Sequence, residues 1–333
     1  MDHAVAIFDK VGDDLDFTVG AASMPEPGPD EVRFKVAAFA LNQADLLLTQ
    51  GRHYVTSDLP IRLGYEGCGT VDAVGVNVTR FKPGDKVSSI PNVDGPYWTG
   101  GEYALAKESF LVGWPEGWSA AQATSFLMQY LTPYYPLAER FRFEPGAWVM
   151  ITAATGGTGL GTIRLAKMLG ARIIATTRSE EKISVLRANG ADVVLSTDQA
   201  DFVERVMEAT EGNGVDLIND SLCGSYVAML SETLAFGGIM YIHGGLSGDN
   251  NFTMNVLNLV HRQAGIHGYS LINELRIPGA LERGCKFLLD HIAKGDLAPP
   301  TIDSVYPLAQ VAEAYRRMQS GKQVGKIVVT VSE

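Results

Sequence analysis

The stretch AWVMITAATGGTGLGTIRLAKMLG, residues 147–170, joins an apolar run to an amphipathic segment through four closely spaced glycines. The apolar run, 147–154, predicts a strand buried on both faces, and the segment 161–170 has helical spacing. The amino terminus of a helix carries unpaired N–H groups and a partial positive charge, and glycine places no side chain in front of them. The stretch therefore predicts a phosphate-binding turn, with a tight turn that binds nothing as the alternative. The residues expected at the phosphate are Thr155, Gly156, Gly157, Thr158 and Gly159, with Gly161 adding a further bare position.

Strands and helices alternate through the centre of the chain. The expected strands are 147–154, 171–178, 191–196, 215–220 and 239–244. The expected helices are 161–170, 179–190, 202–212 and 225–238, the second of them with Ser179 as its N-cap. This order is typical of a parallel sheet with helices on both faces. It predicts an α/β, Rossmann-type doubly wound domain, the context in which a glycine-rich turn binds the pyrophosphate of a dinucleotide.

The two ends of the chain have a different pattern. Short strands between Gly and Pro breakers are expected at 31–42, 69–75 and 84–90, which favours a compact β-rich domain. A helix with Ser119 as its cap is expected at 119–141. Helices at 278–295 and 308–321 and strands at 300–307 and 325–331 complete the expected elements. Because the last strand is placed to complete the first domain, we expect the dinucleotide domain, 123–269, to be inserted into a domain made of 1–122 and 270–333.

The end of the second strand indicates which dinucleotide is bound. Binders of NAD usually place an acidic residue there, about 20 residues past the glycines, to hold the ribose 2′-hydroxyl. This strand ends instead at Arg178, and Lys182 lies about one helical turn further on. A guanidinium pairs well with a 2′-phosphate, so we expect NADP(H). In the alternative, Arg178 is a solvated surface residue and Glu180 or Glu181 reaches the ribose.

Composition excludes several classes of protein. The 333 residues have a formal net charge of −11 and no run of Lys and Arg, which argues against nucleic-acid binding. No apolar run approaches the roughly 18 residues that span a membrane, and the amino terminus does not resemble a signal peptide, so we expect a cytoplasmic protein. The three cysteines are far apart, which excludes a disulfide framework and a cysteine-rich zinc site.

Three separated motifs resemble the medium-chain dehydrogenase/reductases, in the quinone oxidoreductase and enoyl reductase branch. These are GYEGCGTVDAVGVNVTRFKPGDKV (64–87), AATGGTGLG (153–161) and QVGKIVVTV (323–331). The resemblance covers nearly the whole chain. It implies that the β-rich domain is the GroES-like catalytic domain of that superfamily. It also implies a homodimer, because the family commonly pairs the edge strands of two dinucleotide domains.

The resemblance also bears on metal and substrate. The positions that hold catalytic zinc in related alcohol dehydrogenases fall here on Asn42, Tyr65 and approximately Gln129, none of which is a soft ligand, so we expect no zinc. A quinone or an α,β-unsaturated carbonyl needs only hydrogen-bond donors and a proton source, and is the expected small-molecule substrate. The alternatives are an alcohol or ketone oxidoreductase of the same superfamily and a non-catalytic NADPH-binding protein.

Candidate catalytic residues follow from the same resemblance. Asn42 is expected to donate to a carbonyl or to the nicotinamide amide, and Thr132 to lie near the nicotinamide. Tyr54 matches the tyrosine that serves as proton donor in related enoyl reductases, although its spacing is G-x-x-Y rather than G-x-Y; a rim tyrosine that packs on substrate is the alternative. His243 and Gly244 follow the fifth strand, at the edge where ligands lie, and a backbone contact to nicotinamide is expected there.

Other aromatic and histidine residues near these positions are weaker candidates. Tyr130 has helical spacing and is expected in the core. Glu66 matches a residue in the zinc-site pattern of the related alcohol dehydrogenases. Without a metal it is expected to be a structural hydrogen-bonding residue. His53 precedes Tyr54, and acid–base work by His53 or His243 is a minor alternative.

Overall fold

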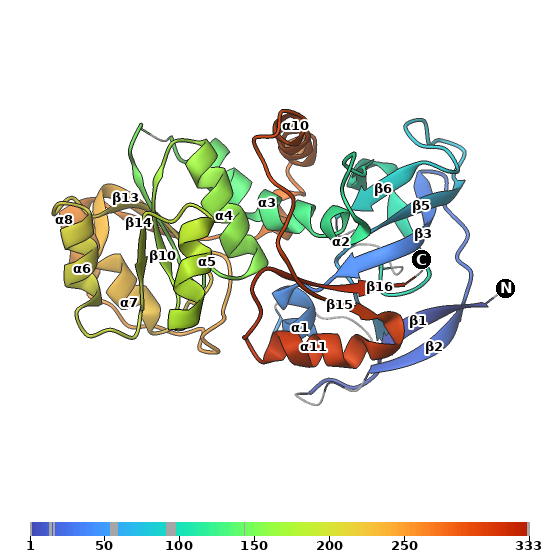
Figure 1. The fold of residues 1–333 in the computed structure, drawn as a ribbon, viewed down its shortest axis with the longest axis horizontal. Helices are drawn as coiled ribbons and strands as arrows, with labels where there is room; N and C mark the ends of the chain where they lie inside the picture. Colours follow the sequence, from blue (N-terminus) through green and yellow to red (C-terminus); the bar gives the residue numbers. More distant parts are fainter. Residues whose placement is uncertain are drawn as a thin grey trace. The chain divides into compact units, whose positions relative to one another are not determined.

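The computed structural model describes residues 2–12, 15, 17–53, 59–90, 98–142 and 144–331 (Figure 1). The chain divides into two compact units. The first consists of Met1–Met128, Leu281–Leu289 and Pro299–Glu333, and the second of Gln129–Ala280 and Asp290–Ala298. Each unit has its own sheet and its own apolar core.

The first unit is β-rich, as expected. Its described strands form a three-stranded sheet in the order β2-β1-β4 and a seven-stranded sheet in the order β15-β16-β3-β5-β6-β8, with β7 also paired to β3. The strands are β1 Asp2–Phe8, β2 Phe17–Ser23, β3 Glu31–Ala40, β4 Ile61–Arg62, β5 Glu66–Val74, β6 Lys86–Ser89, β7 Tyr103–Lys107, β8 Leu111–Gly113, β15 Ile302–Pro307 and β16 Lys326–Thr330. The helices are α1 Gln43–Thr49, α2 Ala120–Ala123 and α11 Val311–Gln319.

The last strand completes this sheet. β16 pairs antiparallel with β3, with Val328 opposite Ala40, and β3 pairs antiparallel with β5. The carboxyl end of β3 therefore lies beside the starts of β5 and β16. The prediction that the final strand joins the amino-terminal domain is confirmed.

The second unit contains a six-stranded sheet in the order β11-β10-β9-β12-β13-β14, and every described pair is parallel. Its strands are β9 Trp148–Ile151, β10 Arg172–Thr176, β11 Val193–Leu195, β12 Val215–Asp220, β13 Leu234–Ile242 and β14 Gly265–Gly268. Its helices are α4 Gly157–Met168, α5 Ile183–Ala188, α6 Phe202–Ala209, α7 Tyr226–Ser231, α8 Val256–Arg262 and α9 Leu271–Glu274. Figure 1 shows α4 and α5 on one face of this sheet and α6, α7 and α8 on the other. The predicted doubly wound sheet is present.

Several predicted elements have different limits. The predicted helix 225–238 ends at Ser231, because β13 begins at Leu234 and passes through Gly237, whose φ is 73°, next to an irregularity in the β12 register. β14 was not predicted as a strand, since four residues with two glycines carry little strand signal. The predicted helix 119–141 is divided into α2, α3 (Phe126–Tyr134) and a π-helical turn, Tyr135–Arg140, with Pro133 inside α3.

Of the two predicted helix caps, one is present and the other is not. The Ser119 side chain accepts a hydrogen bond from Gln122 N at the start of α2, so this cap is confirmed. Ser179 precedes a short 3-10 turn, Glu180–Lys182, and its side chain makes no cap hydrogen bond. The helix predicted at 278–295 is present as α10, Ala280–Ala293. Across the described ranges, we find no helix with the length and apolar character that a membrane crossing requires.

Candidate functional site

The glycine-rich turn lies where β9 leads into α4. Ala153 has a left-handed backbone, with φ 46°, which redirects the chain at the end of the strand. α4 begins at Gly157, and no side chain caps it at Gly156. Gly156, Gly157 and Thr158 are half-buried, whereas Thr155 is buried. The helix of 12 residues therefore presents uncapped first-turn N–H groups at a partly exposed position, which suits an anion.

The glycines of this turn serve two purposes. A Cβ on Gly159 would lie 2.5 Å from the oxygen of Ala154, and a Cβ on Gly161 would lie 2.5 Å from Cγ of Gln129. Both glycines are buried, so their lack of a side chain allows α4 to pack against the chain that leads into it and against α3. A Cβ on Gly156 would meet only the oxygen of Ala153, at 3.7 Å. Close packing thus accounts for Gly159 and Gly161, which the sequence analysis had treated as bare positions for phosphate.

A buried hydrogen-bond network fixes the end of the strand that precedes the turn. Thr152 Oγ1 donates to Asp220 Oδ1 at 2.7 Å and accepts from the backbone N–H of Ser221 at 2.8 Å. The other carboxylate oxygen, Asp220 Oδ2, accepts from Cys223 N at 2.9 Å, and Asp220 is 0% exposed. These bonds tie the end of β9 to the end of β12. The sequence analysis missed Asp220, although an acidic residue that closes an apolar strand was a usable signal.

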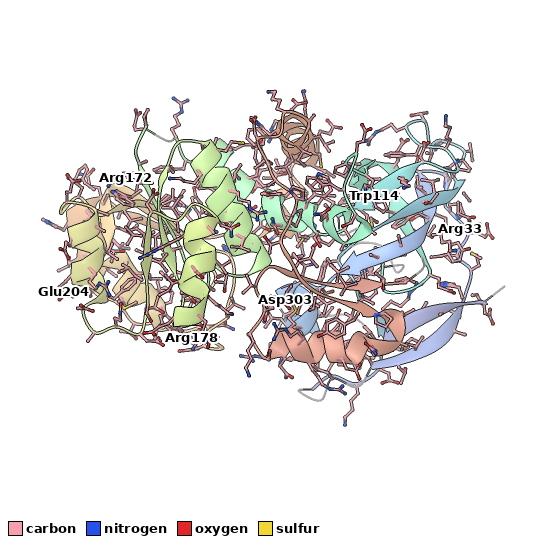
Figure 2. The ribbon with its side chains drawn as sticks, viewed as in Figure 1. Arg33, Trp114, Arg172, Arg178, Glu204 and Asp303 are labelled. Atoms are coloured by element: carbon pink, nitrogen blue, oxygen red, sulfur yellow. The ribbon has the colours of Figure 1, made fainter. Side chains whose placement is uncertain are left out.

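Arg178 lies just beyond β10, at the lower margin of the second unit in Figure 2. It is exposed and forms no hydrogen bond or ion pair with any residue that the structure describes. Lys182, four residues on, is half-buried in the 3-10 turn. β10 ends at Thr176 and is followed by Thr177, so the strand tip carries no acid, as the sequence indicated.

A cavity of about 360 Å³ opens beside Arg178. Arg178, Arg187 and Arg205 contribute guanidinium groups to its wall, and Glu180 and Asp198 contribute carboxylates. Leu195 and Ser196, at the end of β11, also line the cavity. The cavity therefore lies at the carboxyl ends of β10 and β11, which is the edge of a parallel α/β sheet where ligands bind.

His243 and Gly244 follow β13 on the same edge. The N–H of His243 donates to the oxygen of Asp220 at 2.9 Å, and a Cβ on Gly244 would lie 2.8 Å from the oxygen of Ser221. His243 Nε2 is buried and has no hydrogen-bond partner among the described residues. Burial lowers the pKa of His243 to about 4, with Asp220 opposing that shift. The imidazole is therefore neutral near pH 7 and suits hydrogen bonding better than proton donation.

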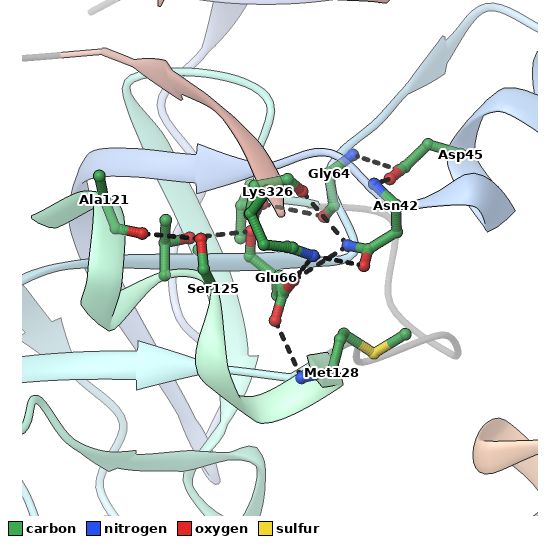
Figure 3. A network of polar contacts seen from close by, with 12 residues as sticks. Asn42, Asp45, Gly64, Glu66, Ala121, Ser125, Met128 and Lys326 are labelled. Atoms are coloured by element: carbon green, nitrogen blue, oxygen red, sulfur yellow. Dashed lines mark hydrogen bonds and ion pairs between the residues drawn. The ribbon is translucent and has the colours of Figure 1, made fainter. Parts of the chain in front are cut away.

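A second polar cluster lies in the first unit, where β3 ends and β5 and β16 begin (Figure 3). Lys326 Nζ lies 2.6 Å from Glu66 Oε1 and 2.7 Å from Asn42 Oδ1. Asn42 Nδ2 donates to the same Glu66 oxygen at 3.2 Å and to the oxygen of Ala40 at 3.3 Å. Glu66 is 0% exposed and Lys326 is 5% exposed. We call Asn42, Glu66 and Lys326 the lysine cluster.

Neighbouring groups hold the lysine cluster in place. Glu66 Oε2 accepts from the N–H of Met128 at 3.0 Å, so both carboxylate oxygens are bonded. Asp45 accepts from Asn42 N at 2.8 Å and from Gly64 N at 3.1 Å. Burial raises the pKa of Asp45 to about 7, against the lowering effect of these hydrogen bonds. The sequence analysis missed Lys326, although a lysine at the start of an otherwise apolar strand was a signal for a buried partner.

The amide of Asn42 is fully used inside the cluster. Its two N–H hydrogens go to Glu66 and Ala40, and its oxygen accepts from Lys326. An Asn side chain has two donor hydrogens, so none remains for a ligand. The expectation that Asn42 donates to a substrate carbonyl does not agree with this arrangement, in which Asn42 orients Lys326.

The remaining candidates are placed as follows. Tyr54 lies outside the described residues. Thr132 is on α3 and 9% exposed. Tyr130 is 0% exposed and its hydroxyl donates to the oxygen of Ala298 at 2.7 Å, so it is the core residue that its spacing predicts. The ring of His53 lies 6.4 Å from that of Tyr65.

Asn42 and Tyr65, at two of the three expected zinc positions, are poor ligands for zinc. The amide of Asn42 is committed, and Tyr65 is 2% exposed with its ring 4.8 Å from that of Trp98. Lys326 Nζ already donates to Asn42 Oδ1 at 2.7 Å, so the amide oxygen is occupied by a cationic donor. Within the described ranges, no group of three or more His, Cys, Asp and Glu side chains is arranged to hold a metal ion.

Two family models match the chain. Residues 28–132 match the alcohol dehydrogenase GroES-like domain, and residues 157–284 match the zinc-binding dehydrogenase family. Over 306 residues the chain is 30% identical to a quinone oxidoreductase of Pseudomonas aeruginosa, covering 91% of this chain and 92% of that protein. The chain belongs to the medium-chain dehydrogenase/reductase superfamily. This confirms the expected pairing of a Rossmann-type domain with a GroES-like domain.

Some relatives are much longer proteins. A mycocerosic acid synthase-like polyketide synthase of Mycobacterium tuberculosis is 30% identical over 92% of this chain. The chain spans only 14% of the length of that protein and of the next two polyketide synthases it matches.

Solved structures of similar proteins cover nearly the whole chain. A Pseudomonas syringae quinone oxidoreductase has a TM-score of 0.89 at 28% identity, covering 98% of this chain and 99% of that one. The CurK enoyl reductase has a TM-score of 0.88 at 25% identity, covering 99% of each chain. A mycobacterial protein complexed with NADPH has a TM-score of 0.87 at 27% identity, covering 98% of this chain and 99% of that one.

Proposed function

We propose that the chain is an NADPH-dependent, zinc-independent oxidoreductase that reduces a quinone or an α,β-unsaturated carbonyl. The observation that carries the proposal is the uncapped start of α4 after β9, together with an unpaired Arg178 and no acid at the tip of β10. Similarity to a quinone oxidoreductase, to an enoyl reductase and to a protein complexed with NADPH supports it. In this proposal the second unit binds the cofactor and the first unit supplies the catalytic domain.

The residues of the second unit fit this cofactor. Gly156, Gly157 and Thr158 would direct first-turn N–H groups at the pyrophosphate, with Thr155 and Gly159 shaping the turn around them. Arg178 would pair with the 2′-phosphate, and Lys182 would add charge. His243 and Gly244 would line the nicotinamide end, and Thr132 would lie near it. When bound, NADPH supplies hydride to an electrophilic carbon of the substrate.

The proposed substrates suit a site without metal. An enone or quinone that accepts hydride becomes an enolate or phenolate, whose oxygen needs hydrogen-bond donors and, later, a proton. Asn42 is proposed to position a neighbouring donor, and Tyr54 to serve as a proton donor. The loss of soft ligands at Asn42 and Tyr65 supports zinc independence.

The first experiment follows NADPH absorbance at 340 nm with chelator-treated protein, given an aromatic quinone and a simple enone side by side. We expect oxidation of NADPH with at least one acceptor and little oxidation of NADH. Activity restored only by zinc, with an alcohol and NADP, would replace this function with alcohol oxidation. Tight NADPH binding without turnover of either acceptor or of the alcohol would indicate a non-catalytic NADPH-binding protein.

We also propose a homodimer formed through the second unit. β14 is an edge strand of the parallel sheet, and one of its sides pairs with no strand that the structure describes. Beside it in sequence, α8 exposes Val256, Leu257 and Val260, at 61%, 69% and 64% of their surface. Apolar side chains that are this exposed, next to an open edge, fit an interface with a second copy.

A further inference from the structure

One N–H of the ammonium group in the lysine cluster has no acceptor among the described residues. An ammonium group has three N–H donors, and Lys326 uses one toward Glu66 Oε1 and one toward Asn42 Oδ1. No described residue accepts the third. Lys326 is 5% exposed, so this donor is withdrawn from bulk water at a cost in free energy. A buried donor without a partner among the described residues is available to a ligand that accepts from it.

Asn42 is the most exposed residue of the lysine cluster. Asn42 is half-buried, whereas Glu66 on the other side of Lys326 is 0% exposed. The ammonium thus lies between a sealed carboxylate and a partly open amide (Figure 3). Because Asn42 has no donor of its own left, Lys326 is the donor that the cluster can offer to a ligand.

The cluster also holds its ammonium rigidly. Glu66 is fixed through Met128 N at 3.0 Å, and Asn42 is fixed through Ala40 and through Asp45, which accepts from the Asn42 backbone. A donor whose position is set before the reaction stabilises developing negative charge without a reorganisation cost. The same partners keep the lysine from turning toward other acceptors.

We propose that Lys326 is a catalytic residue whose third N–H donates to the carbonyl oxygen of the substrate. This inference rests on the proposed function. When hydride adds to the β-carbon of an enone, the C=C electron pair shifts and the carbonyl oxygen takes a negative charge as an enolate. Lys326 stabilises that oxygen by a charge-assisted hydrogen bond and keeps its own proton. A proton from the separate donor of the proposed function adds at the α-carbon and balances the reduction, and solvent then reprotonates that donor. The fixed ammonium supplies the positive charge that a metal would otherwise provide.

The test compares Lys326→Met with the double variant Lys326→Met/Glu66→Gln, which leaves no unpaired carboxylate buried. We expect the double variant to keep most of its Tm, because both charges of the buried pair are removed together. It should keep its NADPH affinity, because both residues lie in the first unit and the proposed cofactor residues lie in the second. Its kcat for an enone should fall by about 10²-fold, the usual effect of losing one oxyanion donor, with a smaller change in KM. Across para-substituted aryl enones, log kcat should become more sensitive to electron withdrawal, an effect that a purely structural role would not produce.

A binding measurement on the unaltered protein covers the case in which the variants do not fold. With NADP bound, 4-nitrophenol serves as an oxyanion mimic whose ionised form is visible by absorbance. We expect the protein to bind the phenolate in preference to the phenol. Equal binding of both forms, or a folded double variant with the original kcat and the original substituent sensitivity, would overturn the role of Lys326 alone. Failure of the unaltered protein to turn over any enone or quinone would overturn the proposed function and this role with it.

Discussion

At the scale of single residues, Arg178 carries the choice of dinucleotide. Its guanidinium is exposed, borders the cavity at the end of β10 and has no partner among the described residues. Such a group is available for a 2′-phosphate, and the pair forms two parallel hydrogen bonds. NADH has a hydroxyl group in place of that phosphate, and the Arg178 guanidinium does not repel a hydroxyl group.

Replacing Arg178 by Ala should therefore weaken NADPH binding selectively. We expect the Kd for NADPH to rise roughly tenfold or more, in line with about 1.5–3 kcal/mol for a hydrogen bond to a charged group. The Kd for NADH should stay within about twofold. Fluorescence titration of both cofactors measures this, with Arg142→Ala, an exposed arginine of the same unit, as control. A loss of NADH affinity in Glu180→Gln, with Arg178→Ala silent, would instead favour the ribose contact by Glu180.

The three thiols should differ in reactivity. Burial raises the pKa of Cys68 and of Cys285 to about 12, and both side chains are buried, whereas Cys223 is half-exposed. Because the thiolate is the reactive form, a raised pKa removes it at pH 8. We expect an aromatic disulfide reagent to titrate one thiol quickly in the native protein and three after denaturation. Rapid native reaction in Cys223→Ser would show that a buried thiol is accessible.

At the scale of elements, two glycines of the turn from β9 to α4 have different roles. Gly159 allows close packing, and Gly156 is proposed to allow a ligand to approach. Gly159→Ala would place a Cβ 2.5 Å from the Ala154 backbone, so we expect a loss of about 2 kcal/mol and a lower Tm. Gly156→Ala would meet only an atom at 3.7 Å and should leave the Tm almost unchanged. Its Kd for NADPH should nevertheless rise, because a methyl group would face the phosphate. Thermal melts and cofactor titration of the two variants measure both effects. Unchanged NADPH affinity in Gly156→Ala would contradict phosphate binding at this turn.

The helices and strands also show which sequence patterns predict secondary structure correctly. The β9 and α4 pattern was predicted because apolar runs and helical spacing depend on neighbouring residues alone. The helix predicted at 225–238 was too long, because the end of a helix against a strand that begins at Leu234 depends on pairing with β12. β14 was missed for the same reason, since its hydrogen bonds to β13, rather than its composition, define it.

At the scale of the whole molecule, the proposed dimer makes a simple prediction. Val260→Glu would place a charge on the exposed apolar face of α8, where Val260 is 64% exposed. We expect the unaltered protein to sediment at twice the 35.8 kDa of a single chain, and the variant to dissociate toward one chain. Val76→Glu, at a position 89% exposed in the first unit, is the control and should remain dimeric. A monomer in the unaltered protein at micromolar concentration would refute the dimer.

The sequence by itself determined the class of fold, the position of the glycine-rich turn and the absence of an acid at the tip of β10. These properties follow from periodicity and from residues that are close neighbours in the chain, so they can be read without a structure. The expected branch of the superfamily rests on the same local motifs.

Only the tertiary structure decided which polar groups meet. Lys326 and Glu66 are 260 positions apart, and the antiparallel pairing of β16 and β5 with β3 brings their side chains to 2.6 Å. That contact uses the amide of Asn42, which the sequence had offered as a free donor. The physical reason is that the number of donors a side chain has left for a ligand depends on every acceptor around it. Those acceptors lie on strands that are far apart in the sequence, and the register of the sheet decides which of them become neighbours.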